Sequence, residues 1–464
     1  MAKRYRVEPR IARRGRVVET GLSSSRDSRE WIQIGRLSED GPPKEVRYDV
    51  TFEHVLAVVG KRGSGKSFTL GSLVEGLCTT NPTTAINHIS KRRGILLFDT
   101  LNIFQWMDTP VGATEARSGQ VAEQRALLKA WSLEPVELDV DLWAPAGYES
   151  RGGHSARPFS IRPWDMEVSD WAALLDVDAV NSIMGQLLTQ VLHKVTVKGW
   201  DTATGEARTP TVKYVLDDLL ECINEDAELL VDYATETRRA VRQRLTAYQA
   251  APIFSSQGTQ LTELIQPGRL SVLLLSGVPD DLRLTVVFLL IRKLLFARAA
   301  ASELDKARQL GVDSQADADG DNAGLDEEVP KTWVVIDEAQ NIFPSERQTS
   351  ATATLLRYVR EGRNFGLSLA FTTQQPSAID ARIMAQVDTL LAHTLTVDRD
   401  IKNVVANLKS RAPTQITYRG RDLSLADAIR ELDVGQAFLS STDAERGLFL
   451  EVRPRTSLHG GFEG

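Results

Sequence analysis

The sequence predicts an α/β fold with a mostly parallel sheet, because apolar strand patterns alternate with helical patterns from residue 55 to residue 409. The first strand leads directly into a glycine-rich loop, 60–67, which is followed by helix-forming residues. Two later apolar strands, 94–99 and 332–336, run into acidic side chains. Open α/β sheets bind their ligands at the carboxyl ends of the strands, so these features indicate one site along one sheet edge.

The loop 60–67 has the pattern GxxxxGKS of a phosphate-binding P-loop. Glycines let the backbone N–H groups turn inward around a phosphate, and the following helix offers its positive N-terminal end to the same group. Lys66 is expected to reach the β- and γ-phosphates, and the Ser67 hydroxyl to complete the oxygen shell of Mg²⁺. The strand ahead and the helix behind favour this interpretation over a chance glycine-rich turn. The predicted nucleotide-binding residues are Gly60, Arg62, Gly63, Ser64, Gly65, Lys66, Ser67 and Phe68.

Composition indicates an ordinary globular protein of more than one structural unit. Its 464 residues are 42% hydrophobic, enough for a large core. Cys78 and Cys222 are too few for a disulfide framework and lack metal-ligand spacing, so core packing and a cytoplasmic location are expected. The basic start precedes no apolar run, which argues against a secretory signal. The net charge of −7 argues against a protein that coats nucleic acid by bulk electrostatics. It leaves open a ring that contacts DNA only along its pore.

The chain divides into three predicted parts. Residues 1–50 contain four short strand patterns and predict a small N-terminal β module. Residues 51–100 and 265–464 are the predicted nucleotide-binding core with a C-terminal arm. Residues 101–264 predict a helical insertion that a Gly, Pro and Arg-rich loop interrupts. The helical patterns of the insertion are 117–131, 169–197, 212–225 and 229–250.

Three basic stretches are candidates for contact with nucleic acid. Residues 1–16 hold seven Lys or Arg against one Glu, and a solvated arm is favoured there. Arg151, His154 and Arg157 lie on a loop with small residues, which suits a phosphate backbone, although exposed basic loops are common. The helical pattern 236–244 carries four arginines, for which a solvated helix face is preferred.

Two further segments carry expectations about their surroundings. The segment 282–301 is the best candidate for a membrane span, but Arg292 and Lys293 interrupt it, so a buried amphipathic helix and no membrane contact are expected. Residues 302–330 are polar and lack periodicity, and 313–328 hold seven acids and no base. This stretch predicts a flexible surface loop.

Acidic residues follow two of the apolar strands. Asp337 is expected to hold Mg²⁺ through its water shell, and Glu338 to orient and polarise the water that attacks the γ-phosphate. A strand that ends in two acids indicates little alone, but a P-loop in the same chain favours the functional interpretation. Asp99 either faces the nucleotide or caps a turn, and both interpretations stay open.

The last third of the chain adds further candidates. The helical pattern 352–366 carries arginines at spacings of three that end with Arg363. Gln374 leaves the next apolar strand at its carboxyl end, where it either senses the γ-phosphate or only satisfies backbone groups. The tail 435–461 predicts a hairpin followed by an extended arm that packs on a neighbouring subunit.

Four segments together resemble the HerA-type ATPases, relatives of the FtsK DNA translocases. They are VVGKRGSGKS, WVVIDEAQ, EGRNFGLSLAFTTQQPS and RPRTSLHGG, in that order. The resemblance covers most of residues 50–464 and is that of a divergent member. TLNIFQ follows Asp99 where the family carries Gly-Glu-Tyr, Gln340 stands where the family commonly has His, and the N-terminal β module is short for the family's barrel.

The resemblance implies a RecA-like P-loop NTPase core and a homohexameric ring with ATP and Mg²⁺ sites between subunits. Such rings thread double-stranded DNA and serve a partner nuclease, or act in antiphage defence beside a nuclease or a sirtuin-like effector. Lys66 and Ser67 match the P-loop pair, and Asp337 and Glu338 match the Mg²⁺-supporting acid and the catalytic base. Arg363 takes the position of the arginine that stabilises transition-state charge. Gln374 matches the sensor position.

Two other functions stay open at this point. The ring either translocates DNA or binds ATP chiefly to assemble and regulate an effector, and the retained Glu338 and Arg363 favour hydrolysis. A small-molecule kinase is a third interpretation, which Arg363 and Gln374 fit poorly.

Overall fold

The computed structural model describes residues 4–8, 17–21, 30–78, 86–112, 119–149, 155–310, 329–345 and 350–461. A central sheet runs through the molecule, in the order β2-β4-β3-β19-β18-β15-β5-β14-β13-β7-β12-β8-β9. Its parallel part consists of β15 (Thr389–Ala392), β5 (Val55–Val59), β14 (Leu367–Thr373), β13 (Thr332–Ile336), β7 (Gly94–Asp99), β12 (Leu270–Leu274), β8 (Val140–Pro145) and β9 (Arg157–Phe159). The predicted α/β class with a mostly parallel sheet is confirmed.

The rest of the sheet is mainly antiparallel and joins the two ends of the chain. Its strands are β2 (Val17–Thr20), β3 (Trp31–Leu37), β4 (Glu45–Asp49), β18 (Gln436–Ser441) and β19 (Leu448–Val452), with β6 (Asn87–His88) paired to β3. The hairpin β18–β19 is the one that the tail predicts. The N-terminal strands therefore continue the sheet of the core through the pairing of β3 with β19. A small separate sheet holds β1 (Arg6–Glu8), β16 (Gln415–Tyr418) and β17 (Arg421–Leu423).

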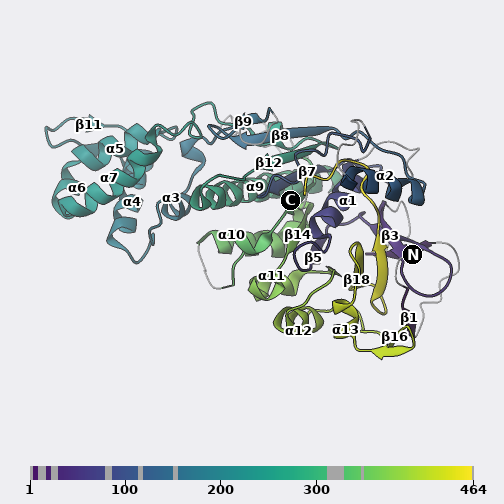
Figure 1. Cartoon of the computed structure of the whole chain (residues 1–464). Coiled ribbons are helices and arrows are strands. Elements are labelled where there is room, and N and C mark those ends of the chain that lie inside the picture. Colours follow the sequence, from purple (N-terminus) through teal and green to yellow (C-terminus); the bar gives the residue numbers. More distant parts are fainter. Residues whose placement is uncertain are drawn as a thin grey trace.

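Helices cover both faces of the central parallel strands (Figure 1), and this is why β5, β7, β12, β13, β14 and β15 are buried along their whole length. In β5, Leu56 and Val58 join the core under α1 (Lys66–Cys78), whereas Val55, Ala57 and Val59 join the core of the opposite face. The opposite face is covered by α9 (Asp280–Leu310) and α10 (Ser350–Glu361), which also pack on each other. The remaining helices of the core are α2 (Gly119–Trp131), α8 (Leu261–Leu264), α11 (Ala381–Gln386), α12 (Asp398–Ala406) and α13 (Leu425–Arg430).

The insertion gathers its helices at one end of the molecule, to the left in Figure 1. They are α3 (Val168–Leu174), α4 (Ile183–His193), α5 (Leu216–Glu225), α6 (Ala227–Asp232) and α7 (Thr235–Gln249), with the hairpin β10 (Trp200–Asp201) and β11 (Ala207–Arg208). The pattern 169–197, predicted as one helix, is two helices followed by a π-helical turn at Lys194–Lys198. The break comes at 175–182, where Ser182 caps α4. The strands β8 and β9 also lie inside 101–264 but belong to the central sheet, and α2 lies away from the helical end of the insertion, to the right of it in Figure 1.

Helix α9 is the buried amphipathic helix expected at 282–301. Its two interrupting cations both contact the insertion: Arg292 Nη2 donates to the backbone oxygen of Asp165, and Lys293 Nζ lies 2.7 Å from the Asp165 carboxylate. The helix runs on to Leu310, so the start of the expected loop 302–330 is helical. The acidic residues 313–328 lie outside the described residues. Among the described helices, none is long and apolar enough to cross a membrane.

The C-terminal arm packs on its own chain, and the expected contact with a neighbouring subunit stays a prediction. Arg453 and Arg455 are fully buried, and both pair with Glu75 in α1. Further along, the backbone of Leu458 bonds to Thr109, and Gly460 bonds to Ile103. The arm is thus clamped between α1 and the loop that follows β7. Cys78 and Cys222 are buried and free, as their core role predicts.

Candidate nucleotide-binding site

The loop 60–67 joins β5 to α1 and is shaped by glycines. A Cβ on Gly60 would lie 2.5 Å from Ser64 Oγ, so only glycine fits there. Gly63 and Gly65 have φ of 72° and 98°, a conformation that other residues rarely adopt. Ser64 is buried and its hydroxyl donates to Lys61 O at 2.8 Å, which closes the turn. The result is a glycine-lined loop that opens at the N-terminus of α1.

Lys66 begins α1 and curls back over the loop. Its Nζ donates to Lys61 O at 2.9 Å, and the residue is 4% exposed. Burial lowers the pKa of Lys66, while the nearby carboxyls of Glu338 and Asp337 act in the opposite direction. Lys66 is thus a cation that faces two acids across the loop. A phosphate chain and its metal ion would fit between the cation and the acids.

Ser67, in the first turn of α1, meets Asp337, which follows the carboxyl end of β13. Ser67 Oγ lies 3.1 Å from Asp337 Oδ1, and the Thr372 hydroxyl donates to the same oxygen at 2.5 Å. Burial, together with repulsion from Asp99 and Glu338, raises the pKa of Asp337 to about 7. A hard cation at this point would offset that cost, since nearby positive charge favours the ionised carboxyl.

Glu338 is held in an unusual conformation beside Asp337. Its φ and ψ are both 54°, the left-handed region, which costs a non-glycine residue roughly 1–2 kcal/mol. Its backbone N–H donates to Thr372 Oγ1 at 3.0 Å. Its carboxylate accepts hydrogen bonds from two amides, Gln374 Nε2 at 2.7 Å and Gln340 Nε2. Both oxygens of Glu338 are therefore fixed in place over the same sheet edge.

Asp99 is a turn cap, which decides between its two interpretations. One carboxylate oxygen accepts the backbone N–H groups of Leu101 and Ile103, and the other accepts that of Phe104 at 2.7 Å. Burial raises the pKa of Asp99 to about 6, against the effect of these bonds. The side chain is occupied with the turn after β7 and acts on Asp337 only through its charge.

Arg363 lies at the opposite edge of the sheet from the other predicted site residues. It precedes β14, whose seven residues span roughly 20 Å, whereas Gln374 follows β14 at the P-loop edge. Its Nη2 lies 2.7 Å from Asp388 Oδ2, and the same carboxylate oxygen accepts the N–H of Val55, the first residue of β5. Arg363 thus lies at the amino end of β5, whereas the loop 60–67 begins at the carboxyl end of the same strand.

The remaining predicted nucleotide ligands flank the loop. Arg62 is exposed at its tip. Phe68 is half-buried in α1, and its ring meets the edge of the His459 ring at a centroid distance of 5.5 Å. The arm that carries His459 therefore borders the site.

Sequence reasoning missed two residues of this edge and the role of a third. Thr372 bonds to both acids, and its signal was a pair of threonines at the end of an apolar strand. His393 follows β15 and its Nε2 lies 2.8 Å from Thr69 Oγ1, so a histidine that leaves an apolar strand could have been noticed. Burial lowers the pKa of His393 to about 4. Gln340, noted only as a departure from the family, contacts Glu338.

The basic candidates lie elsewhere. Arg151, His154 and most of residues 1–16 are outside the described residues. Arg157 is exposed at the start of β9, where it pairs with Asp141 at 3.3 Å. Of the arginines of α7, Arg244 donates to the backbone oxygen of Leu175. Arg239 and Arg242 of the same helix are exposed, and the preference for a solvated helix face stays a prediction.

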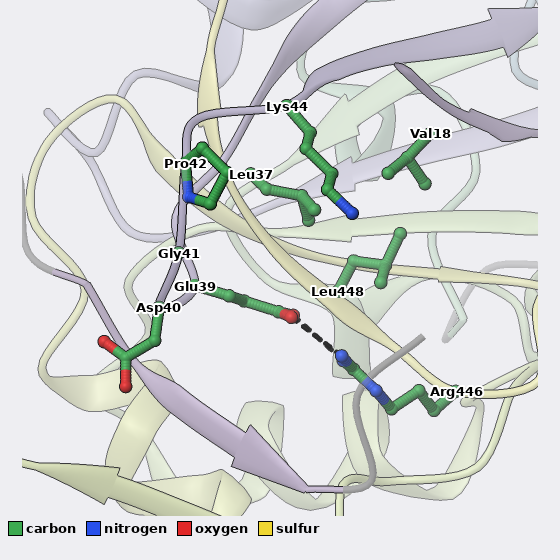
Figure 2. Close-up of a pocket in the computed structure, with 9 residues that line it drawn as sticks. All are labelled: Val18, Leu37, Glu39, Asp40, Gly41, Pro42, Lys44, Arg446 and Leu448. Carbon is green, nitrogen blue, oxygen red and sulfur yellow. Dashed lines mark hydrogen bonds and ion pairs between the residues drawn. The ribbon is translucent and has the colours of Figure 1, made fainter. Parts of the chain in front are cut away.

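A separate pocket of about 100 Å³ lies by the N-terminal strands (Figure 2). Glu39 and Arg446 point toward each other across it and form a buried ion pair. None of the predicted site residues lines this pocket. Its lining residues are Val18, Leu37, Glu39, Asp40, Gly41, Pro42, Lys44, Arg446 and Leu448.

A parallel sheet with a P-loop at one strand end and acids at the ends of two neighbouring strands defines a P-loop NTPase fold. The chain belongs to the HerA helicase family, because the family described as "Helicase HerA, central domain" matches residues 32–294. Residues 301–402 match the family described as "Zonular occludens toxin (Zot)".

Relatives and solved structures agree with this placement. The DNA double-strand break repair helicase HerA of Pyrococcus furiosus is 24% identical over 380 residues, which cover 80% of this chain and 62% of that protein. A probable helicase of Methanocaldococcus jannaschii is 29% identical over 107 residues, 23% of this chain and 19% of that one. The chain thus spans less than two thirds of either relative. The structure of VirB4 of Thermoanaerobacter pseudethanolicus has a similar fold, with a TM-score of 0.51 at 13% identity, covering 91% of this chain and 96% of that one.

Proposed function

We propose that this protein is a cytoplasmic ATPase that assembles into a homohexameric ring and drives movement along double-stranded DNA. The observation that carries the proposal is the division of its predicted site residues between two sheet edges. Lys66, Ser67 and Glu338 share one edge, and Arg363 lies at the other. A complete site then needs two copies of the chain, as in a ring built from head-to-tail contacts.

The residues at the loop fit a nucleotide with Mg²⁺. The glycines leave room for phosphate oxygens against the backbone, and Ser67 with Asp337 supplies the oxygen ligands that Mg²⁺ prefers. When bound, Mg²⁺ would neutralise charge on the β- and γ-phosphates. Lys66 would turn from Lys61 O to the phosphate chain and bring a positive charge to its terminal oxygens.

Glu338 supplies the base that hydrolysis needs. Gln374 and Gln340 hold both oxygens of its carboxylate, so a water bonded to that carboxylate would be oriented at the end of the phosphate chain. Gln374 would also respond to the loss of the γ-phosphate, because it contacts Glu338, which positions the attacking water. This contact favours the sensor interpretation of Gln374 over a merely structural one.

Arg363 would complete the site of the neighbouring subunit. It is too far along β14 to reach the loop of its own chain, and its side chain is 40% exposed. An arginine that reaches across a subunit interface in this way is worth about 10³-fold or more in rate. ATP turnover would then depend on assembly.

Double-stranded DNA is the proposed track because two relatives are named as DNA double-strand break repair helicase and probable helicase. A partner nuclease, or a sirtuin-like or other effector in antiphage defence, is proposed from the family resemblance. A ring that binds ATP only to assemble and regulate such an effector is the competing function. The strained, amide-held Glu338 favours turnover over that alternative.

Steady-state ATP hydrolysis with and without blunt duplex DNA tests the proposal, together with mass photometry of the assembly. Duplex DNA is expected to stimulate turnover of a hexamer. Glu338→Gln should lose about 10²-fold or more in kcat yet still bind ATP, whereas Lys66→Ala should lose binding itself. DNA that neither binds nor stimulates, with an ATP-dependent assembly still formed, would favour the scaffold instead.

A further inference from the structure

Asp388 stands directly before β15 at the amino edge of the sheet and holds Arg363. We propose that Asp388 is a positioning residue that orients the Arg363 guanidinium toward the phosphate chain bound by the adjacent subunit. The inference rests on the proposed function, because it takes Arg363 as the arginine that completes a neighbour's site. It adds a residue that the sequence patterns did not single out.

The pair is asymmetric in the way that such a role requires. Asp388 is 8% exposed, whereas the Arg363 side chain is 40% exposed. Arg363 uses only Nη2, which donates to Asp388 Oδ2 at 2.7 Å and to Gln386 O at 3.1 Å. Within the described part of the chain, Nε and Nη1 make no hydrogen bond. One nitrogen is therefore anchored while the other donors remain available to an anion from outside.

A fully buried ion pair in the same molecule has a different geometry. Arg446 and Glu39 are both buried, and both terminal nitrogens of Arg446 donate to the two oxygens of Glu39, at 2.9 and 2.7 Å. Such a fork-to-fork pair leaves few donors for a ligand. The Arg363 pair forgoes this geometry, and as a partly exposed pair it contributes at most about 1 kcal/mol to stability. The Arg363–Asp388 pair therefore serves to orient the guanidinium rather than to stabilise the fold.

Asp388 is itself held rigidly by the start of β5. Its side-chain Oδ2 accepts the N–H of Val55 at 3.0 Å, and its own backbone N–H donates to Val55 O at 2.9 Å. His54 Nδ1 lies 3.5 Å from the same carboxylate oxygen, and the backbone N–H of Thr442 donates to Asp388 O. Although burial raises the pKa of Asp388, His54, the Val55 N–H and Arg363 outweigh it and hold that pKa below its usual value.

Anchoring of this kind reduces the entropy lost when the arginine meets its target. A free arginine side chain carries about 2 kcal/mol of rotamer entropy, part of which is lost on binding. Tethering Nη2 to a buried carboxylate restricts the guanidinium before the neighbouring subunit binds. Less entropy is then lost when Arg363 contacts the transition state, so the transition state is stabilised more strongly. Loss of the tether should lower kcat while leaving KM for ATP almost unchanged, since the neighbour's loop still binds the phosphates.

The test compares Asp388→Asn with Glu361→Gln in the assembled ATPase. Glu361 is a matched control because it pairs with Arg357 at 2.8 Å on the exposed face of α10, two residues before Arg363. We expect Asp388→Asn to lower kcat by at least about tenfold with KM changed by less than about twofold. Glu361→Gln should leave both constants unchanged. An unchanged or raised kcat in Asp388→Asn would overturn the inference.

A double-mutant cycle separates positioning from a general structural effect. If Asp388 acts through Arg363, adding Asp388→Asn to Arg363→Ala should lower kcat no further, whereas additive losses contradict the inference. Should Asp388→Asn fail to fold, Asp388→Glu keeps the charge but displaces the carboxylate by one methylene. It is expected to reproduce the loss of kcat, and full activity in it would refute positioning. If Arg363→Ala alone leaves kcat unchanged, the proposed shared site fails and the inference with it.

Discussion

Replacement of Glu75 by Gln is predicted to destabilise the fold more than any surface substitution. Glu75 lies in α1 with no exposed surface. Its carboxylate is 3.2 Å from Arg453 Nη1 and 3.5 Å from Arg455 Nε, and it accepts the backbone N–H groups of Thr456 and Ser457, both at 2.9 Å. Burial raises its pKa, but the two guanidinium groups outweigh burial and hold the pKa of Glu75 below its ordinary value.

The magnitude follows from what the substitution leaves behind. Glu75→Gln keeps the size of the side chain but leaves Arg453 and Arg455 buried without the carboxylate that both of them pair with. Removing one partner of a buried ion pair costs about 3–5 kcal/mol. The matched control is Glu228→Gln, because Glu228 pairs with Lys194 while its side chain is 60% exposed. That change should cost less than about 1 kcal/mol.

Urea unfolding followed by tryptophan fluorescence measures the free energy of unfolding of both variants. Limited trypsin digestion adds a local readout, because Arg455 is buried in the native arm and should become cleavable once the arm loosens. A loss of under about 1 kcal/mol for Glu75→Gln, with Arg455 still protected, would refute the view that the arm is held by this cluster.

Two further predictions concern the same helix and its neighbour. Gly71→Ala should destabilise the fold by about 1–3 kcal/mol despite the better helix propensity of alanine, because its Cβ would lie 2.8 Å from the Arg455 guanidinium. Gly119→Ala is the control and should not destabilise the fold, because the space around its Cβ is open. Equal thermal unfolding of the two variants would argue against this packing of Gly71. Burial lowers the pKa of His393 to about 4, so on acidification the unfolded chain takes up this proton first, at about pH 6.5. The contribution of His393 to the free energy of unfolding should therefore fall by about 3 kcal/mol between pH 6.5 and pH 4. His393→Asn should flatten that part of the pH profile of unfolding, and parallel profiles would contradict the assignment.

The sheet and the loop edge were largely predictable because their signals are local. The strand Val55–Val59, the loop and α1 follow from periodicity and from the GxxxxGKS spacing, and Thr332–Ile336 is where the apolar run before the two acids predicts it. Parallel strands deliver their carboxyl ends to one edge, so the meeting of Ser67 with Asp337 needed no further information.

What could not be predicted depends on contacts between residues far apart in the chain. The pattern 169–197 looks like one helix until Ser182 and the packing of the insertion divide it. Asp99 could have faced a ligand, and only the turn after β7 shows that its oxygens are taken. The burial of Arg453 against Glu75, 378 residues earlier, has no local signature, and neither does the anchoring of Arg363 by Asp388.

The central claim is that Lys66 and Arg363 serve sites in different subunits, and mixing two inactive variants tests it most directly. Lys66→Ala lacks a working loop and Arg363→Ala lacks the arginine, so each alone should be inactive. In rings assembled from equal amounts, about one quarter of interfaces would pair an intact loop with an intact arginine, and ATP hydrolysis should return to that extent. If both residues served the same subunit's site, the mixture would stay as inactive as its components.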